Sequence, residues 1–204
     1  MTRISAVFLT LLLLAGCSSE PSKPAEAPQP KGPELLTGRS AFQKLYIQAR
    51  GWSPDAKPFR LESQYSKDSN GRDGKASIWR ASFASPAKGA VKPFLWSGTD
   101  SPDAPARGVS PGSEDSYSAG NSNTQIFDIA FMKVDSDKAF DEAQKHGGNK
   151  VLQKNPDLPV LYTADWNSRE NELIWHVLYG TDRDSAKLKV AVNASSGEFL
   201  RLEK

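Results

Sequence analysis

The segments LIWHVLY, at residues 173–179, and ASIWRASF, at residues 76–83, decide the fold. In each segment, large apolar side chains alternate with other residues, a period of two that is typical of strands with one buried face. Both segments are therefore predicted to be strands centred on a buried tryptophan. The residues that share the predicted buried face are Trp175, Val177 and Tyr179 in the first segment and Trp79, Ala81 and Phe83 in the second.

A helix is predicted upstream of each tryptophan strand, because apolar residues recur there at helical spacing. The first covers residues 40–49, with Thr37 as its expected cap and Gly51 at its end. The second covers residues 136–146, with Ser136 as its expected cap and Gly147-Gly148 as its stop. The predicted buried faces consist of Phe42, Leu45, Tyr46 and Ala49 in the first helix and Ala139, Phe140 and Ala143 in the second.

The spacing between helix and strand is nearly the same in the two halves of the chain. Trp79 follows Phe42 by 37 positions, and Trp175 follows Phe140 by 35. This agreement indicates that one structural unit occurs twice. The alternative is chance, because helices and strands alternate in many domains.

Further strand candidates extend the repeat. An extended segment precedes each tryptophan strand, at residues 59–65 and 160–166. A later strand carries Trp96 or Val192, each 17 positions beyond its tryptophan. We therefore predict an α+β fold of two modules, each with one helix packed on an antiparallel sheet of about three strands. Modules of roughly 60–70 residues are marginal alone, so we expect one compact unit.

The predicted domain boundaries follow composition. The first module covers residues 37–97 and the second covers residues 125–204. Residues 98–124 between them are rich in Ser, Gly and Pro and are expected to form a flexible connector or a functional loop. Residues 126–134, IFDIAFMKV, alternate and are predicted to form a strand that leads into the second helix.

The N-terminus reads as an export signal. In residues 1–17, MTRISAVFLTLLLLAGC, Arg3 precedes an apolar run that is too short to cross a bilayer. The run ends in Leu-Ala-Gly16-Cys17, which resembles the lipobox of bacterial lipoproteins. That resemblance implies a signal peptide over residues 1–16, cleavage between Gly16 and Cys17, and acylation of the Cys17 thiol by diacylglycerol. The alternative is an ordinary leader that happens to end near a cysteine.

Residues 17–36 are predicted to be the lipidated cysteine and a proline-rich tether, since such a segment favours extended conformations. Fatty acyl chains such as palmitate on Cys17 would make membrane lipid the first partner. Ser18 follows the cysteine, and resemblance to Gram-negative lipoproteins then implies an outer-membrane anchor facing the periplasm. The expected location is the cell envelope.

Composition excludes several classes of function. The chain of 204 residues has 26 Lys and Arg against 24 Asp and Glu, a net charge of +2, so charge gives no support for a nucleic-acid partner. One cysteine cannot form an intrachain disulfide. The two histidines, His146 and His176, show no metal-binding spacing. We therefore expect no metal site and no cofactor.

The end of the chain, residues 160–204, resembles a PepSY-type domain. Trp175 and Val177 match the family's aromatic strand, and residues 193–198, NASSGE, match its Asp-Ala-x-Thr-Gly-Glu-like turn. Asn193 and Ser196 depart from the usual Asp and Thr but preserve turn hydrogen bonding. Gly197 would supply the positive φ of the turn. The resemblance implies a helix on antiparallel strands, and a binding or regulatory role rather than catalysis.

Three smaller patterns receive structural interpretations. His146 is expected at a helix C-terminus, and His176 is expected on a solvated sheet face, at the position of Arg80 in the first module. Residues 67–74, KDSNGRDG, contain calcium-ligand residue types, but their register does not fit an EF-hand, and a hairpin turn explains them. No nucleophile motif or catalytic constellation appears in the sequence.

Three tryptophans next to Gly, Ser or Asn at element ends, Trp52, Trp96 and Trp166, are candidates for an exposed aromatic cluster that binds a peptide or glycan. The favoured function is a non-enzymatic, lipid-anchored envelope protein whose modules bind a protein or peptide, by strand addition at an open sheet edge. The alternatives are an inhibitor or regulator of an envelope or secreted peptidase, and an unrecognised enzyme.

Overall fold

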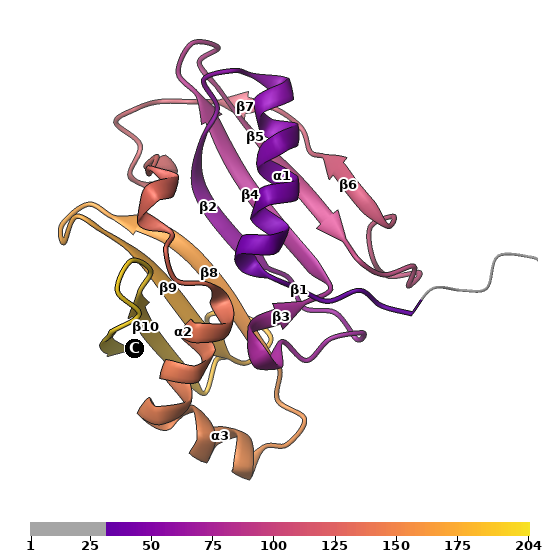
Figure 1. Ribbon diagram of the computed structural model, residues 1–204, viewed down its shortest axis with the longest axis vertical. Coiled ribbons are helices and arrows are strands. Elements are labelled where there is room, and N and C mark those ends of the chain that lie inside the picture. Colours follow the sequence, from indigo (N-terminus) through magenta and orange to yellow (C-terminus); the bar gives the residue numbers. More distant parts are fainter. Residues whose placement is uncertain (1–31) are drawn as a thin grey trace, which may run out of the picture. The chain divides into compact units, whose positions relative to one another are not determined.

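One antiparallel sheet of nine strands runs through residues 32–204, the part of the chain that the computed structural model describes (Figure 1). The strands follow the order β11-β10-β9-β8-β2-β4-β5-β6, and β7 pairs with β5 beside β6. Short strands β1 and β3 form a separate pair. The bounds are β1 Leu36–Thr37, β2 Lys57–Ser63, β3 Lys75–Ala76, β4 Ile78–Ser85, β5 Ala90–Ser97, β6 Gly108–Pro111, β7 Asp115–Ser116, β8 Val160–Asn167, β9 Glu172–Tyr179, β10 Leu188–Asn193 and β11 Phe199–Glu203.

The two halves of the chain meet at the centre of the sheet. Strands β2 and β8 pair antiparallel there, with Leu61 opposite Ala164. The earlier strands continue outward from β2 and the later strands outward from β8. Neighbouring strands pair antiparallel, and helices pack on the sheet. The predicted α+β class is therefore confirmed.

The spacing of 17 residues seen in both halves has a direct structural meaning. Trp79 of β4 lies opposite Trp96 of β5, and Trp175 of β9 lies opposite Val192 of β10. Each pair shares one face of the sheet, because residues directly opposite each other point to the same side. A fourth strand, β6 or β11, then extends each half beyond the three strands that were predicted.

The helices lie on one face of the sheet (Figure 1). Helix α1 (Gly38–Trp52) packs on β4 and β5, and α2 (Ser136–Ala143) packs on β9 and β10. Phe42, Leu45 and Ala49 of α1 are buried, as their helical spacing predicted. Among the described residues, no helix has the length and apolar character needed to cross a bilayer.

The second helix differs from its prediction at both ends. Asp135 rather than Ser136 occupies the N-cap position, and its carboxylate accepts a hydrogen bond from the Ser136 N–H. After Ala143 the chain makes a π-helical turn (Gln144–Gly148) in which Gly147 has a φ of 111°. Helix α3 (Asn149–Lys154) follows. The predicted stop at the two glycines is therefore a kink, because the left-handed conformation of Gly147 redirects the helix instead of ending it.

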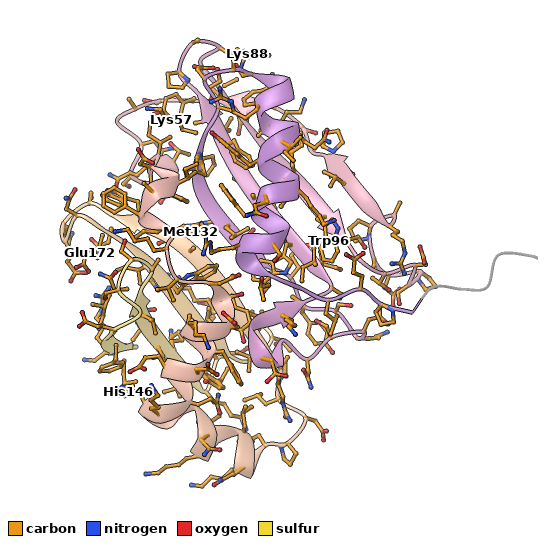
Figure 2. All side chains as sticks on the ribbon, in the orientation of Figure 1. Lys57, Lys88, Trp96, Met132, His146 and Glu172 are labelled. Carbon is orange, nitrogen blue, oxygen red and sulfur yellow. The ribbon has the colours of Figure 1, made fainter. Side chains whose placement is uncertain are left out.

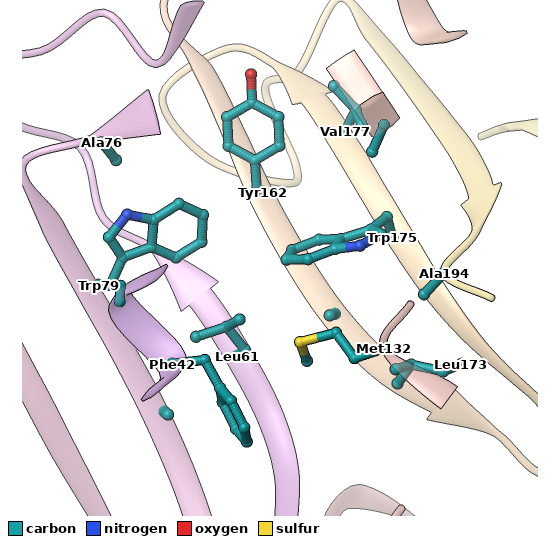
Figure 3. Packing of buried hydrophobic residues seen from close by; sticks show 14 of the residues in the cluster. Phe42, Leu61, Ala76, Trp79, Met132, Tyr162, Leu173, Trp175, Val177 and Ala194 are labelled. Carbon is teal, nitrogen blue, oxygen red and sulfur yellow. The ribbon is translucent and has the colours of Figure 1, made fainter. Parts of the chain in front are cut away.

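The two tryptophans form the centre of one core. Trp79 and Trp175 are fully buried, and Figure 3 shows their indoles on either side of Tyr162. The Trp79 Nε1–H donates to the Leu36 carbonyl at 2.9 Å, and the Trp175 Nε1–H donates to the Val134 carbonyl at 3.0 Å. Each indole thus bonds the main chain two residues before a helix begins.

The N-termini of α1 and α2 meet beside these indoles. The Asp135 carboxylate accepts hydrogen bonds from the Arg39 N–H at 2.8 Å and from the Thr37 hydroxyl at 2.7 Å, in addition to its bond with Ser136. The Gly38 N–H donates to the Ser136 hydroxyl at 2.7 Å. Because both helix N-termini carry partial positive charge, one carboxylate stabilises both.

Two predictions about the middle of the chain are wrong in part. Residues 126–134 form no strand; they make a loop with a short 3₁₀ turn, Ile129–Phe131. The main chain of this loop bonds its neighbours only at isolated points: the Phe127 N–H donates to the Pro58 carbonyl of β2, and the Val134 N–H donates to the Ala194 carbonyl after β10. Residues 98–124 are more than a connector, since β6 and β7 lie within them and extend the sheet beyond β5.

The turn at residues 193–198 has the predicted chemistry. Gly197 has a φ of 82°. The Asn193 side-chain oxygen accepts hydrogen bonds from the Ser195 and Ser196 N–H groups, at 2.8 and 3.0 Å. The Ser195 hydroxyl instead donates to the Phe131 carbonyl, which ties the turn to the segment before α2.

Candidate functional site

The sheet face opposite the helices carries a row of polar and charged side chains. Along the register, Arg80 lies opposite Glu62, Glu62 opposite Thr163, and Thr163 opposite His176. The row continues through Ala191 to Arg201 on β11. Trp79, Trp175 and the residues in register with them point to the helix side of the sheet. Because successive side chains of a strand alternate between the two faces, the row of polar residues points to the opposite side.

His176 is the buried centre of this row. Its side chain is 7% exposed. Its Nδ1 lies 2.8 Å from a Glu203 carboxylate oxygen, and its Nε2 lies 3.1 Å from an Asp165 oxygen. The small side chain of Ala191, which lies opposite His176 on β10, lets His176 reach Glu203 on the strand beyond. With a carboxylate at each nitrogen, both nitrogens donate, so the ring is an imidazolium.

The charges of this cluster support each other. Burial alone would lower the pKa of His176, but the hydrogen bonds to Asp165 and Glu203 outweigh burial and raise the pKa. Burial, the largest single effect, would raise the pKa values of Asp165 and Glu203, but the hydrogen bond and charge of His176 together with the charges of nearby arginines outweigh it and hold both low. Arg60 contacts Asp165 at 3.4 Å, and Arg183 contacts Glu203 at 3.4 Å. The shifts therefore favour the charged form of all three groups.

This arrangement restricts the chemistry of His176. A ring with both nitrogens bonded to carboxylates has no free lone pair to act as a general base or to hold a metal. Within residues 32–204, no group of three or more His, Cys, Asp or Glu side chains is placed to bind a metal ion. The contacts instead tie three strands together, because Asp165 lies on β8, His176 on β9 and Glu203 on β11.

A hollow of about 340 Å³ opens above this cluster, at the end of the β8–β9 hairpin. Three arginines, Arg169, Arg183 and Arg201, line it together with His176. Its other lining residues are Ser122, Gln125, Asp165, Trp166, Asn167, Ser168, Ile174 and Glu203. Cationic groups therefore outnumber acidic groups on its wall.

Strand β11 borders the hollow and forms one free edge of the sheet. Arg201 and Glu203 face the hollow, whereas Leu202 between them points to the helix side and is 55% exposed. Exposed apolar residues on an open edge strand are a site for pairing with another chain. β11 therefore combines an unpaired edge with an exposed apolar side chain.

The interpretation of His176 as a solvated residue was wrong, although its face was predicted correctly. The alternation of β9 places it opposite to Trp175, but the two carboxylates that cover it come from β8 and β11. His146 lies not at a helix C-terminus but in the kinked turn between α2 and α3, where it bonds Glu142 at 3.0 Å and stacks on the Phe199 ring. The sequence offered no sign that Asp165 and Glu203 converge on one ring.

The three candidate tryptophans do not form one exposed cluster. Trp96 is 3% exposed and packs in the core, so the expectation of an exposed ring is wrong there, because its register with Trp79 turns it inward. Trp52 is half-buried, with its Nε1–H bonded to Glu114 and the Lys88 ammonium over its ring. In Figure 2, Lys88, whose ammonium lies over the Trp52 ring, and Trp96 lie at opposite ends of α1, so Trp52 and Trp96 do not lie together. Trp166 is half-buried and packs edge-on against Phe131.

The KDSNGRDG segment connects β2 and β4 as predicted, but it is not a simple hairpin turn, because it contains a 3₁₀ turn, Arg72–Gly74, that packs against α2, with Gly71 and Gly74 in the left-handed region. The Asp68 carboxylate accepts hydrogen bonds from the hydroxyls of Thr99 and Ser101, at 2.7 and 2.5 Å. These bonds hold its pKa low. A carboxylate that binds hydroxyls of its own chain has a structural explanation that needs no calcium ion.

The predicted cleavage and lipid-attachment positions, Gly16 and Cys17, lie outside the described residues. Comparison with known proteins adds no relative: no family model matches this chain, and neither a curated protein nor a solved structure does.

Proposed function

We propose that this chain is a non-enzymatic lipoprotein of the cell envelope, anchored through acylated Cys17, whose two PepSY-like modules bind an extended segment of a partner protein. The segment adds a strand to the free edge of β11. The observation that carries the binding proposal is the outward main chain of β11 next to the exposed Leu202. For a Gram-negative cell, we place the anchor in the outer membrane, with the modules in the periplasm.

The proposal of two related modules is supported by contacts as well as by sequence spacing. From the β2–β8 pair outward, the strands of each half appear in the same order along the chain. Each half bonds its central indole N–H to the main chain two residues before its helix, at Leu36 and Val134. Two equivalent hydrogen bonds of this kind are not expected from chance alternation of helices and strands.

The direction of the main-chain groups favours β11 as the binding edge. The Asn193 N–H donates toward β11, to the Glu198 carbonyl, whereas the Ala194 N–H donates toward β9, to the Leu173 carbonyl. Because these groups alternate along a strand, Ala191 faces β11 and Val190 faces β9. Leu202, opposite Val190, therefore directs its own N–H and C=O away from the sheet.

The opposite edge is a poorer template. Strand β6 has four residues, begins at Gly108, whose φ is 106°, and ends at Pro111. Proline lacks the N–H that a new strand would need, and short edges with proline resist pairing. The two edges of the sheet thus differ in their capacity to accept a strand.

The test replaces one edge residue in two ways. Leu202→Pro removes the outward N–H but leaves the bonds between β10 and β11, and edge strands tolerate proline at such positions. Leu202→Ala is the matched control, because it keeps the N–H and removes the exposed side chain. Cells expressing the full chain are treated with a crosslinker, and adducts of the tagged protein are compared. We expect one adduct that Leu202→Pro loses and Leu202→Ala retains, although weakened.

Hydrogen exchange distinguishes a partner strand paired with β11 from a protein that is crosslinked without pairing there. In the crosslinked sample, the β11 peptide of the wild-type chain should exchange its amides more slowly than in the free protein. An adduct of equal yield in the Leu202→Pro variant, or unchanged exchange in β11, would exclude strand addition at this edge.

The anchor is tested at Cys17. We expect Cys17→Ala to abolish incorporation of labelled fatty acid and to leave the precursor uncleaved, because the thiol is the only acceptor in the lipobox-like segment. Labelling is measured in whole cells, with Cys17→Ser as the second variant. Labelled fatty acid on either variant would contradict the assignment.

A further inference from the structure

The hollow beside β11 holds more positive charge than its own acidic groups neutralise. Arg169, Arg183, Arg201 and the His176 imidazolium line it, against two carboxylates, Asp165 and Glu203. The outer partners, Arg60 on Asp165 and Glu170 on Arg201, add one charge of each sign and leave the excess unchanged.

The acceptors of the hollow are occupied, whereas its donors are in excess. Both Glu203 oxygens lie near cationic groups: one accepts from His176 and contacts Arg183, and the other lies 3.7 Å from Arg201. The Asp165 oxygens contact His176 and Arg60. Each guanidinium has five N–H donors, so these contacts use only part of the supply.

Arg169 is the arginine of the hollow with the most unused N–H donors. It lies at the turn between β8 and β9, and its guanidinium makes no hydrogen bond or ion pair within residues 32–204. Arg201, by contrast, is bonded to Glu170 at 2.9 Å. A planar guanidinium matches a carboxylate with two parallel bonds.

The hollow lies where a strand added to β11 would place alternate side chains. Residues opposite Arg201 or Glu203 on the new strand would point to the hollow side, and the residue opposite Leu202 would point to the helix side. A residue opposite Arg201 therefore stands beside the surplus arginine donors.

We infer that the hollow is a carboxylate-binding subsite that receives an acidic side chain of the segment added at β11, with apolar neighbours of that acid packing beside Leu202. This inference rests on the proposed function and specifies its partner as an extended segment with an apolar–acidic–apolar pattern. The bound acid accepts from Arg169 and Arg201, and it reduces the excess of positive charge in the hollow.

The experiment compares two peptides with the purified full chain. One is a blocked Thr-Val-Glu-Val-Thr peptide and the other is the same peptide with Gln in place of Glu, so that the pair differs only in charge. Binding is followed by NMR, through arginine side-chain N–H signals and the amides of β11, at fixed ionic strength. We expect the Glu peptide to bind about tenfold more tightly, the effect of one charge-assisted contact.

Variants connect the preference to the hollow. Arg169→Gln should reduce the preference for Glu over Gln to less than about threefold, with no change in unfolding, because Arg169 has no structural partner within the described residues. Arg50→Gln, on the helix side of the sheet, is the matched control and should leave the preference unchanged. Sodium acetate, a free carboxylate, should shift the signals of Arg169 and Arg201 before those of Arg50.

The outcomes distinguish this inference from strand addition. Equal binding of both peptides, abolished by Leu202→Pro, would overturn the acidic subsite and support the proposed function. Shifts with acetate but no binding of either peptide would overturn the acidic segment, and with it the support for the β11 edge. A preference for Glu that Arg169→Gln and Arg201→Gln leave intact would move the subsite elsewhere and overturn the assignment to this hollow.

Discussion

Two glycines of α1 predict opposite effects of the same substitution. A Cβ added to Gly38 would lie 2.6 Å from the Trp175 ring and 3.2 Å from the Trp79 ring. A Cβ added to Gly51 would meet nothing within 4 Å. Both glycines have negative φ and lie inside the helix, so backbone strain does not separate them.

The magnitudes follow from packing and chain entropy. Both indoles are fully buried and bonded through Nε1, so neither ring moves freely to admit the new methyl group. Overpacking of this kind costs about 1–3 kcal/mol. Replacement of glycine by alanine restores about 0.5–1 kcal/mol where the backbone is compatible. We therefore expect Gly38→Ala to destabilise by about 1–2 kcal/mol and Gly51→Ala to stabilise by about 0.5–1 kcal/mol.

Urea unfolding, followed by tryptophan fluorescence, measures both variants against the wild-type chain. With an m-value of about 2 kcal/mol/M, the two midpoints should differ by about 1 M. The near-ultraviolet circular dichroism of Gly38→Ala should also change, because the substitution displaces an indole. If Gly38→Ala raised the midpoint as much as Gly51→Ala, the contact between the α1 N-terminus and the two indoles would be refuted.

Three further predictions concern charged side chains. Asp135→Ala is expected to destabilise the fold by about 2–4 kcal/mol, because it removes charge-assisted bonds from two helix N-termini. The control Asp137→Ala affects α2 alone and should cost about 1 kcal/mol or less in the same urea assay. Equal costs of the two substitutions would contradict the shared cap at Asp135. For His176, the raised pKa means that its contribution is complete below about pH 6.5 and is lost as pH rises through the folded pKa. His176→Gln should therefore cost more free energy of unfolding at pH 6 than at pH 9, and a pH-independent cost would exclude a charged ring. Asp165 and Glu203, with lowered pKa values, should lose their contributions as pH falls through those values, below about pH 4.

The sequence by itself predicted the local elements. The alternation around Trp79 and Trp175 gave both the strands and their buried faces, and the helical spacing of Phe42, Leu45 and Ala49 gave α1. The turn at residues 193–198 was also predictable, since Asn and Gly have few conformations in which they satisfy such a turn. These features depend on residues close together in the chain, and periodicity reports them directly.

The candidate site could not be predicted in the same way. His176 was placed on the correct face but assigned to solvent, because Asp165 and Glu203 reach it only after β8, β9 and β11 are aligned. Trp96 was a candidate for an exposed aromatic cluster, but its register with Trp79 buries it. Residues 126–134 alternate like a strand, yet in the fold their main chain bonds its neighbours only at isolated points, such as the Phe127 N–H to the Pro58 carbonyl.

What the sequence determined is therefore which segments become strands or helices and which side of each is apolar. The tertiary structure alone decided the pairing of β2 with β8, the shared cap at Asp135 and the charged surroundings of His176. The physical reason is range: periodicity arises from the geometry of a single element, whereas these contacts join residues from distant parts of the chain and depend on how whole elements pack.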